Sequence, residues 1–492
     1  MTLVRALGGV FAIVLAAGAL AAVVLAIGIA EREPLDVRVA RIATEGSAAA
    51  EPARDPFAWS EAQRAALERG AALGASHVIY EKSPGGVVAS ARRTDRWRGL
   101  ISDAAERHGV EAATIEAIVF LESAGRPYVS AGPTPEAASG LAQIIPSTAT
   151  ELLGMKVDLA ASIALTERIA AAKSSAEAER LRAQRAAVDE RFDPEKAIEG
   201  AATYLEIARE RFGAEDLAIA SYHMGIGNLE NVLRAFAGAD PRTPIRELIE
   251  REALSYGEVF FRSSPIENSK SHELLSGFLD ESSQYPWKVR AAANIMRRWR
   301  EDPEGLAETA ELATAKATLE EVFHPESETE VFDDPDELED AILRGEVVPL
   351  PRLPRLGWIP ANQIGELSGE LEVSPAIYRA LRPEALATLS YLAGVTKEIG
   401  GEEAPLRVSS AVRDRSYQEL LVGRNPEATS EYSLHTTGWS FDVLRDYASE
   451  RQGRAFQYGL DRLSSLALID YAVEPGAIHV TVSKLGGKLL RE

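Results

Sequence analysis

The feature that most constrains this chain is an uninterrupted apolar run near its N-terminus. Arg5 is followed by 25 uncharged, strongly apolar residues, Ala6–Ala30, and then by the charged triplet Glu31–Glu33. As an α-helix this run would extend about 38 Å, enough to cross a hydrocarbon core about 30 Å thick. A cleaved leader has a shorter apolar stretch, of roughly 7–15 residues. We therefore expect residues 6–30 to form a transmembrane anchor, and the small residues Gly28 and Ala30 leave cleavage open as the alternative.

Charge and composition narrow the classes of partner and chemistry. The net charge of −22 argues against nucleic acid, because binding a polyphosphate requires clustered cations. The chain has no cysteine, which excludes disulfides, thiolate metal sites and cysteine nucleophiles. Any transition-metal site must therefore be built from carboxylates and the seven histidines.

The texture of the chain changes several times after the apolar run. Residues 31–56 lack sustained periodicity and are expected to be a tether. Residues 57–300 show helical periodicity, with a solvated helical hairpin or insertion at 166–192. Residues 301–356, with an acidic tract and several prolines, indicate an inter-domain region. In 357–492, helical stretches such as Pro383–Ile399 alternate with short β-like runs such as Leu406–Ser409, which is typical of an α+β domain.

Three local motifs follow one another in the helical part. The first, Phe120-Leu121-Glu122-Ser123, ends an amphipathic helix. The second spans Ala138–Ala149 and contains a glycine turn, and the third spans Ala218–Asn228. Alone, each has an ordinary explanation: a solvated helix end, a helix start and a turn. Their order and spacing together point to a site.

The chemistry of these motifs suits cleavage of a glycosidic bond. That reaction needs a carboxylic acid that is still protonated near neutral pH, and apolar surroundings raise a carboxyl pKa. Glu122 follows apolar residues on its helix, so a partly desolvated carboxyl is expected there. The turn at Gly140 lets the backbone approach a ligand, while Gln143 and Tyr222 offer hydrogen bonds and a ring face to a sugar.

Residues 97–236 resemble the lytic transglycosylase family of the lysozyme superfamily. That family has a catalytic Glu-Ser pair, a Gly-Leu-Met-Gln block and an Ala-x-x-Tyr-Asn-Ala-Gly block. The resemblance implies that Glu122 is the general acid and that Ser123, Gln143 and Tyr222 contact substrate. Ala142 replaces the family's Met, and His223-Met224 replaces Asn-Ala; these departures concern subsite preference more than chemistry. Tyr256 is a further candidate for the sugar groove, with a core tyrosine as the alternative.

Members of that family cleave peptidoglycan between MurNAc and GlcNAc with a single acid and no cofactor. The acid then acts as a base on the C6 hydroxyl of MurNAc, so a 1,6-anhydro product forms and no second carboxylate is needed. Ordinary glycosidases use two carboxylates instead. With Arg5 inside, the expected location is a single-pass protein of the bacterial inner membrane, with its domains on the periplasmic side.

A second constellation lies near the C-terminus. His435 and Asp442 are seven residues apart, and His479 lies on a β-like run far downstream. These are three ligands of the kind Zn²⁺ accepts, with a fourth position left open. Arg413, upstream in Ser410-Ala411-Val412-Arg413, could hold an oxyanion or a substrate carboxylate. The alternative is that two histidines and one aspartate never meet in space.

Residues 408–482 resemble the zinc D-Ala-D-Ala carboxypeptidase and dipeptidase family. The resemblance implies zinc-ligand roles for His435, Asp442 and His479, and a substrate or oxyanion contact for Arg413. Many members place a general-base Glu three residues before the last His, where this chain has Gly476. The nearest acid is Glu474, which could act from a rearranged loop.

The sequence therefore predicts a multidomain protein with a transmembrane helix, a mainly α lysozyme-like domain and an α+β zinc-peptidase-like domain. A bifunctional peptidoglycan hydrolase is the first interpretation. A transglycosylase whose C-terminal domain only binds metal or peptide is the second. A non-enzymatic cell-wall scaffold is the third, and the Glu122-Ser123 pair speaks against it.

Overall fold

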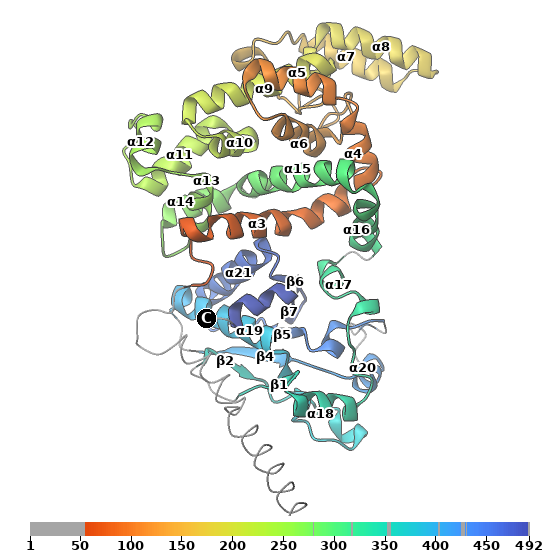
Figure 1. Ribbon diagram of the computed structural model, residues 1–492, viewed down its shortest axis with the longest axis vertical. Coiled ribbons are helices and arrows are strands. Elements are labelled where there is room, and N and C mark those ends of the chain that lie inside the picture. Colours follow the sequence, from red (N-terminus) through yellow and green to blue (C-terminus); the bar gives the residue numbers. More distant parts are fainter. Residues whose placement is uncertain are drawn as a thin grey trace, which may run out of the picture. The chain divides into compact units, whose positions relative to one another are not determined.

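The protein forms two compact units, seen in the computed structural model of Figure 1. The structure describes residues 55–278, 280–315, 318–351, 356–401, 404–424, 429 and 431–490. The helical unit comprises Asp55–Pro325 with Gln457–Asp470, and the sheet unit contains Glu326–Phe456 with Tyr471–Glu492. The division at Glu326 falls inside the region 301–356, which the sequence assigns to an inter-domain segment and which contains helices in the structure.

The expected anchor at residues 6–30 and most of the tether at 31–56 lie outside the described residues. Among the residues that are described, no helix is both long enough and apolar enough to cross a membrane.

The helical unit is built around α15, which packs against α3 and α6. The buried face of α15 repeats at helical spacing through Val289, Ala292 and Met296, as the sequence predicts. The elements of this unit that precede α21 are α3 (Glu61–Lys82), α4 (Val87–Asp95), α5 (Arg98–His108), α6 (Ala112–Ser123), the π-helix η1 (Thr148–Leu152), α7 (Leu159–Ala170), α8 (Ser175–Val188), η2 (Glu190–Phe192), α9 (Pro194–Phe212), α10 (Glu215–Met224), α11 (Ile226–Ala237), α12 (Ile245–Glu252), α13 (Tyr256–Arg262), α14 (Ser269–Gly277), η3 (Glu281–Gln284), α15 (Tyr285–Glu301), α16 (Pro303–Ala315) and α17 (Leu319–Phe323).

The end of α6 sets the position of the candidate acid. Ala124 takes a left-handed conformation at φ 51°, and its N–H bonds to Phe120 O. Gly125 follows at φ 71°, and a Cβ there would come within 2.5 Å of Thr94 N. The chain must therefore turn directly after Ser123, which leaves Glu122 in the last turn of a buried helix.

The hairpin predicted at residues 166–192 is present as α7 and α8, which pack against each other. Asp158 caps α7 by accepting a bond from Ala161 N, and Ser174 caps α8 by accepting one from Glu177 N. The hairpin ends at Asp189, a completely buried carboxylate that accepts a hydrogen bond from the Ser162 hydroxyl at 2.7 Å.

The sheet unit has a five-stranded sheet with the strand order β2-β4-β5-β7-β6, which confirms the expected α+β region. Strands β2 and β4 are parallel, whereas β4–β5 and β5–β7 are antiparallel; β1 and β3 form a separate pair. Elements α21 and β6 run across the division between the units. The elements are η4 (Glu326–Glu328), α18 (Pro335–Arg344), β1 (Val348–Pro349), β2 (Trp358–Pro360), η6 (Ser368–Leu371), β3 (Ala380–Leu381), α19 (Pro383–Gly400), β4 (Leu406–Ser410), α20 (Arg415–Val422), η7 (Leu434–Thr437), β5 (Ser440–Leu444), α21 (Glu450–Ser465), β6 (Ile469–Val473), β7 (Ala477–Val482) and η8 (Lys484–Leu490).

Candidate active site and metal centre

Glu122 lies in the last turn of α6, and its side chain is partly exposed. Burial raises the pKa of its carboxyl to about 7, against the opposing effect of a hydrogen bond from Tyr285. The Tyr285 hydroxyl donates to Glu122 Oε1 at 2.6 Å, across 163 residues of sequence. A carboxyl with this pKa is partly protonated at neutral pH, which is the state that a general acid requires.

Tyr285 is held in place by aromatic neighbours on α10. Its ring stacks on Tyr222, with centroids 6.1 Å apart and planes 6° apart, and it also lies 5.1 Å from the His223 ring. Burial raises the pKa of Tyr285 well above its ordinary value, so the phenol remains a neutral donor. Sequence reasoning missed Tyr285, because nothing around it in the chain relates it to the three motifs.

Tyr222 joins the second motif to the third. Its hydroxyl donates to Ala142 O at 2.9 Å, while its ring contacts Tyr285. Thus Glu122, Tyr285, Tyr222 and Ala142 form one connected series, which we call the acid cluster. The structure brings together residues from all three sequence motifs.

Gln143 lies next to this cluster in a strained turn. It has a positive φ of 46°, and its side-chain amide donates to Gly140 O at 2.8 Å and to Val129 O at 3.2 Å. Gly140 itself has φ 81°. Positive φ is unusual for a non-glycine residue and is maintained only where surrounding contacts fix it.

Two other candidate residues have structural positions. The Ser123 side chain is only 1% exposed, and its hydroxyl donates to Val119 O within α6. It therefore presents no exposed surface to a substrate here. Tyr256 is fully buried and donates to Ser283 O at 2.6 Å, which agrees with the core interpretation.

Two charged residues, one on η3 and one on α15, change the pKa of Glu122. The negative charge of Glu281 raises the pKa of Glu122, whereas the positive charge of Lys288 lowers it. Glu281 is half-exposed and forms an ion pair with Lys288. The imidazole of His223 bonds to the Ser282 hydroxyl at 2.9 Å, so the His-for-Asn replacement connects α10 to η3.

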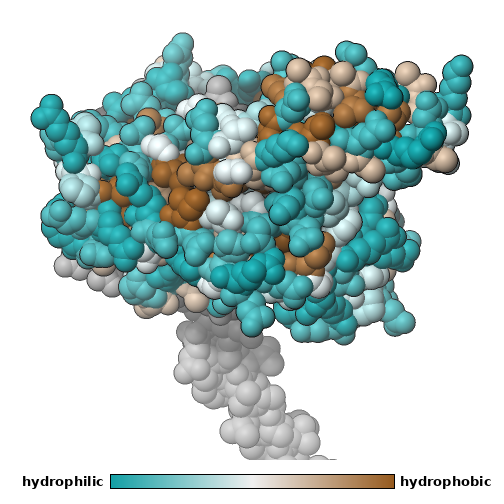
Figure 2. Space-filling model, turned by 90° about the horizontal axis from the view of Figure 1, so that it is seen from above, coloured by the Kyte–Doolittle hydropathy of each residue, from teal (hydrophilic) through white to brown (hydrophobic). Residues whose placement is uncertain are grey.

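The surface after α6 is partly apolar. Tyr128, Ile145 and Leu152 are exposed by 38%, 47% and 39%, although each is a large apolar or aromatic residue. On the face shown in Figure 2, apolar areas alternate with hydrophilic side chains. Exposed rings and aliphatic groups of this kind are compatible with stacking against sugar faces.

In a comparison with protein-family models, residues 99–163 and 170–243 match the transglycosylase SLT domain. The match includes the acid cluster residues on α6, the Gly140 turn and α10, and it supports a lysozyme-like, peptidoglycan-directed lytic transglycosylase domain. A comparison with curated proteins found no match.

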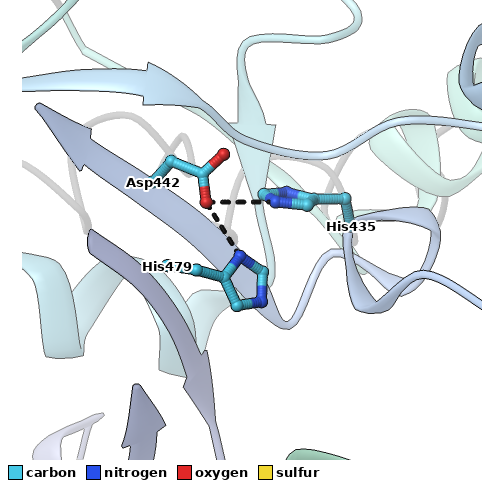
Figure 3. Close-up of side chains that lie close together, drawn as sticks. All are labelled: His435, Asp442 and His479. Carbon is cyan, nitrogen blue, oxygen red and sulfur yellow. Dashed lines mark hydrogen bonds and ion pairs between the residues drawn. The ribbon is translucent and has the colours of Figure 1, made fainter. Parts of the chain in front are cut away.

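The second candidate site is in the sheet unit, where three side chains converge (Figure 3). His479 Nδ1 lies 2.8 Å from Asp442 Oδ1, and His435 Nε2 lies 3.2 Å from the same oxygen. The strand register explains part of this, because Asp442 on β5 is directly opposite His479 on β7. His435 comes from η7, immediately before β5.

The donor chemistry of this triad fits a zinc ion. Four tetrahedral ligands at about 2.0–2.1 Å from zinc lie roughly 3.3 Å from one another. The three ligand atoms here all lie within 4.8 Å of each other. His435 Nδ1 is 2.8 Å from Ala411 O, which fixes the ring and leaves Nε2 for a metal. Although burial opposes it, the two imidazoles hold the pKa of Asp442 well below its usual range.

Arg413 lies beside the triad. Its guanidinium donates to Ser410 Oγ at 2.6 Å and to Gln418 Oε1 at 2.9 Å, and it is 3.7 Å from Asp442 Oδ2. Burial lowers the pKa of Arg413, an effect that the negative charges of Asp442 and Glu474 oppose. Glu474 is exposed in the turn between β6 and β7, and its N–H bonds to Ala477 O.

A segment before the sheet braces this site, and sequence reasoning did not include it. We call residues 330–333 the brace. Phe332 is 1% exposed; its N–H bonds to Thr436 O, and its carbonyl accepts from Arg415 N, both at 2.9 Å. Asp333 pairs with the Arg415 side chain at 2.7 Å. The brace thus connects the loop that carries His435 to the start of α20, next to Arg413.

Proposed function

We propose that this protein cleaves peptidoglycan glycan strands with Glu122 as the single acid and base, and that it forms 1,6-anhydro-MurNAc ends. The observation that carries the proposal is a carboxyl of pKa about 7 that accepts a 2.6 Å hydrogen bond from a neutral tyrosine. Glu281, whose charge also acts on Glu122, is half-exposed and paired with Lys288. A single-acid mechanism therefore suits the site better than one with two carboxylates.

In the first step, protonated Glu122 gives its proton to the glycosidic oxygen as the bond from C1 of MurNAc to O4 of GlcNAc breaks. The GlcNAc end leaves as an alcohol, and positive charge develops at C1. The Glu122 carboxylate then takes the proton of the C6 hydroxyl, and the C6 oxygen bonds to C1. This closes the anhydro ring and restores the acid. Tyr285 stabilises the carboxylate between the two steps, since its hydrogen bond favours the ionised form.

Digestion of purified sacculi tests this proposal. The protein lacking residues 1–30 should release muropeptides that are 18 mass units lighter than the hydrolytic products, because water is not added. Glu122→Gln should release none. Hydrolytic products from the wild type, or equal release by Glu122→Gln, would contradict the single-acid mechanism. Tyr256→Phe is a matched control, since it deletes a buried hydroxyl that does not contact Glu122.

As a second function we propose that the sheet unit is a zinc-dependent peptidase acting on peptidoglycan stem peptides. The convergence of His435, Asp442 and His479 beside a buried guanidinium supports it. These three residues would hold the ion, which supplies Lewis acidity toward an amide carbonyl. Arg413 would bind a terminal carboxylate with its remaining donors, and Glu474 would move the proton from the turn between β6 and β7.

Zinc content and peptide cleavage separate this function from its alternative. The wild-type protein should contain one zinc ion per chain and release D-Ala from a stem pentapeptide. His435→Ala should contain no zinc. Zinc without cleavage would support a metal- or peptide-binding module instead. Retention of zinc by His435→Ala would remove the metal site altogether. Glu474→Gln should stop cleavage and leave zinc bound, because Glu474 is not in the triad.

We also propose that residues 6–30 anchor the protein in the bacterial inner membrane, with both units on the periplasmic side. The uncharged run of 25 residues supports this proposal. Membrane fractionation with alkaline extraction tests it: the intact chain should stay with the lipid. A shortened, extractable chain in the periplasm would show that the segment is cleaved.

A further inference from the structure

A completely buried ion pair lies beneath the loop that carries Gln143. Arg191 and Asp189 are both 0% exposed, and they are joined by two hydrogen bonds, at 2.9 and 2.8 Å. The remaining donors of Arg191 go to carbonyl oxygens: Nη1 to Ala137 and Ile144 at 3.2 Å, and Nη2 to Pro135 at 2.7 Å. All five N–H donors of the guanidinium therefore have partners.

The three carbonyls belong to one stretch, residues 135–144, which we call the knotted loop. Its backbone crosses that of Arg191 so closely that a Cβ at Gly140 would lie 1.7 Å from Arg191 O. The loop is further closed by reciprocal hydrogen bonds between Ser139 and Ile144, both at 3.2 Å. The hydrogen bonds from Arg191 and the bridge between Ser139 and Ile144 thus fix the conformation of the loop.

The knotted loop includes part of the acid cluster. Ala142 O accepts the Tyr222 hydroxyl, and Gln143 follows directly at φ 46°. A shift in the loop would therefore change the direction of the Gln143 side chain. The same shift would move the carbonyl oxygen of Ala142, which accepts the hydrogen bond of the Tyr222 hydroxyl.

A buried ion pair at this place indicates what the structure requires of the loop. Apolar residues of the same volume often give a fold equal or greater stability, because desolvating two charges is costly. A planar guanidinium, however, holds several carbonyls in fixed directions, which neither apolar groups nor lysine can do. The pair therefore fits a requirement for a defined loop geometry more than a requirement for stability.

We propose that the Asp189–Arg191 pair is a positioning element for glycan binding: it fixes the knotted loop so that Gln143 and Tyr222 meet the sugar. This rests on the glycan-cleaving function proposed above. Arg191 does not touch the substrate. It acts through the carbonyls of Pro135, Ala137 and Ile144, and the hairpin α7–α8 supports it through the bond from Ser162 to Asp189.

The test uses the full-length protein in detergent with Arg191→Lys. Lysine keeps the charge but has three donors instead of five, so some loop carbonyls lose their partner. Losing one sugar hydrogen bond weakens binding about tenfold. We expect KM for glycan strands to rise about tenfold with unchanged kcat. In Glu122→Gln protein, calorimetry should show a similar loss of affinity for a GlcNAc tetramer, with faster amide exchange in residues 135–144.

Arg234→Lys is the matched control. Arg234 is another largely buried arginine, bonded to Glu230 at 3.0 Å and to Thr243 O at 3.3 Å, and it does not contact the knotted loop. It should leave KM, tetramer affinity and loop exchange unchanged. Asp189→Asn is the second variant if Arg191→Lys does not fold, because it keeps the shape of the carboxylate and removes its charge.

Two results would overturn the proposal. One is unchanged exchange and tetramer affinity in a folded Arg191→Lys or Asp189→Asn. The other is a fall in kcat with constant KM, which would place the effect on the acid and not on binding. Amide exchange and calorimetry do not depend on turnover. Absence of anhydro products from the wild type would thus refute the proposed reaction without deciding the role of Arg191.

Discussion

Replacing Tyr285 by Phe isolates the hydrogen bond that reaches the acid. The substitution removes the hydroxyl 2.6 Å from Glu122 Oε1 and leaves the ring, which stacks on Tyr222, in place. That bond lowers the pKa of Glu122, so its loss raises the value above about 7. A hydrogen bond to a charged group is worth about 1.5–3 kcal/mol, and one pKa unit corresponds to 1.36 kcal/mol. The expected rise is about one to two units.

The sign of the effect on activity follows from the role of the acid. Only protonated Glu122 can protonate the leaving oxygen, so activity falls as pH rises through its pKa. The alkaline midpoint of kcat/KM should lie near 7 in the wild type and about one to two units higher in Tyr285→Phe. Rates on glycan strands, measured between pH 5 and 10, give both midpoints.

Tyr256→Phe is the control for this measurement. Tyr256 also donates a 2.6 Å bond from a buried ring, but its acceptor is Ser283 O. Its midpoint should equal that of the wild type. A midpoint for Tyr285→Phe that stays at the wild-type value, or that moves to lower pH, would refute the assigned effect of the hydrogen bond on Glu122.

Three further perturbations give measurable outcomes. Glu122→Gln should become more stable relative to the wild type as pH rises from 4.5 to about 7. The raised pKa of Glu122 contributes to the free energy of unfolding of the wild type fully below pH 4.5, and this contribution is lost as pH rises through the folded pKa. For a shift of about 2.5 units the loss is at most about 3 kcal/mol. Denaturant titrations across that range should show the difference, and a constant gap would argue against the raised pKa. Gly140→Ala places a Cβ 1.7 Å from Arg191 O at φ 81° and should lower the melting temperature and weaken tetramer binding, both measurable on one sample. Phe332→Ala should release zinc to a lower concentration of chelator than the wild type does, because it removes a buried ring from the segment whose backbone bonds to Thr436 O; equal release would show that the brace does not affect the proposed metal site.

Much of the sheet unit could be predicted because its signals are local. The expected stretches Pro383–Ile399 and Leu406–Ser409 correspond to α19 and β4, and both have apolar residues at the spacing of their element. The residues of the candidate metal triad could be predicted, but their arrangement in space could not. Its convergence depends on a register that pairs Asp442 with His479, and only the folded sheet sets that register.

The glycan site was less predictable in its supporting residues. Glu122 could be found because its neighbours on α6 are apolar and its motif is local. Tyr285 and Arg191 could not, since each acts on the site through tertiary contact. A tyrosine at the start of a helix and an arginine in a short turn have no local pattern that distinguishes them from ordinary residues. Phe332, in the region assigned to an inter-domain segment, could not be predicted as part of the second site for the same reason.

The brace has a consequence for how such proteins can be recombined. A gene segment starting at residue 357 would carry His435, Asp442 and His479, and on paper it would be a complete module. It would nevertheless leave the carbonyl of Thr436 and the N–H of Arg415 without the backbone of Phe332. Exchange of this module between proteins therefore tolerates a junction before Glu326 and penalises one after the acidic helix α18. A module that keeps these backbone hydrogen bonds must therefore begin before residue 330, well upstream of the three candidate ligands.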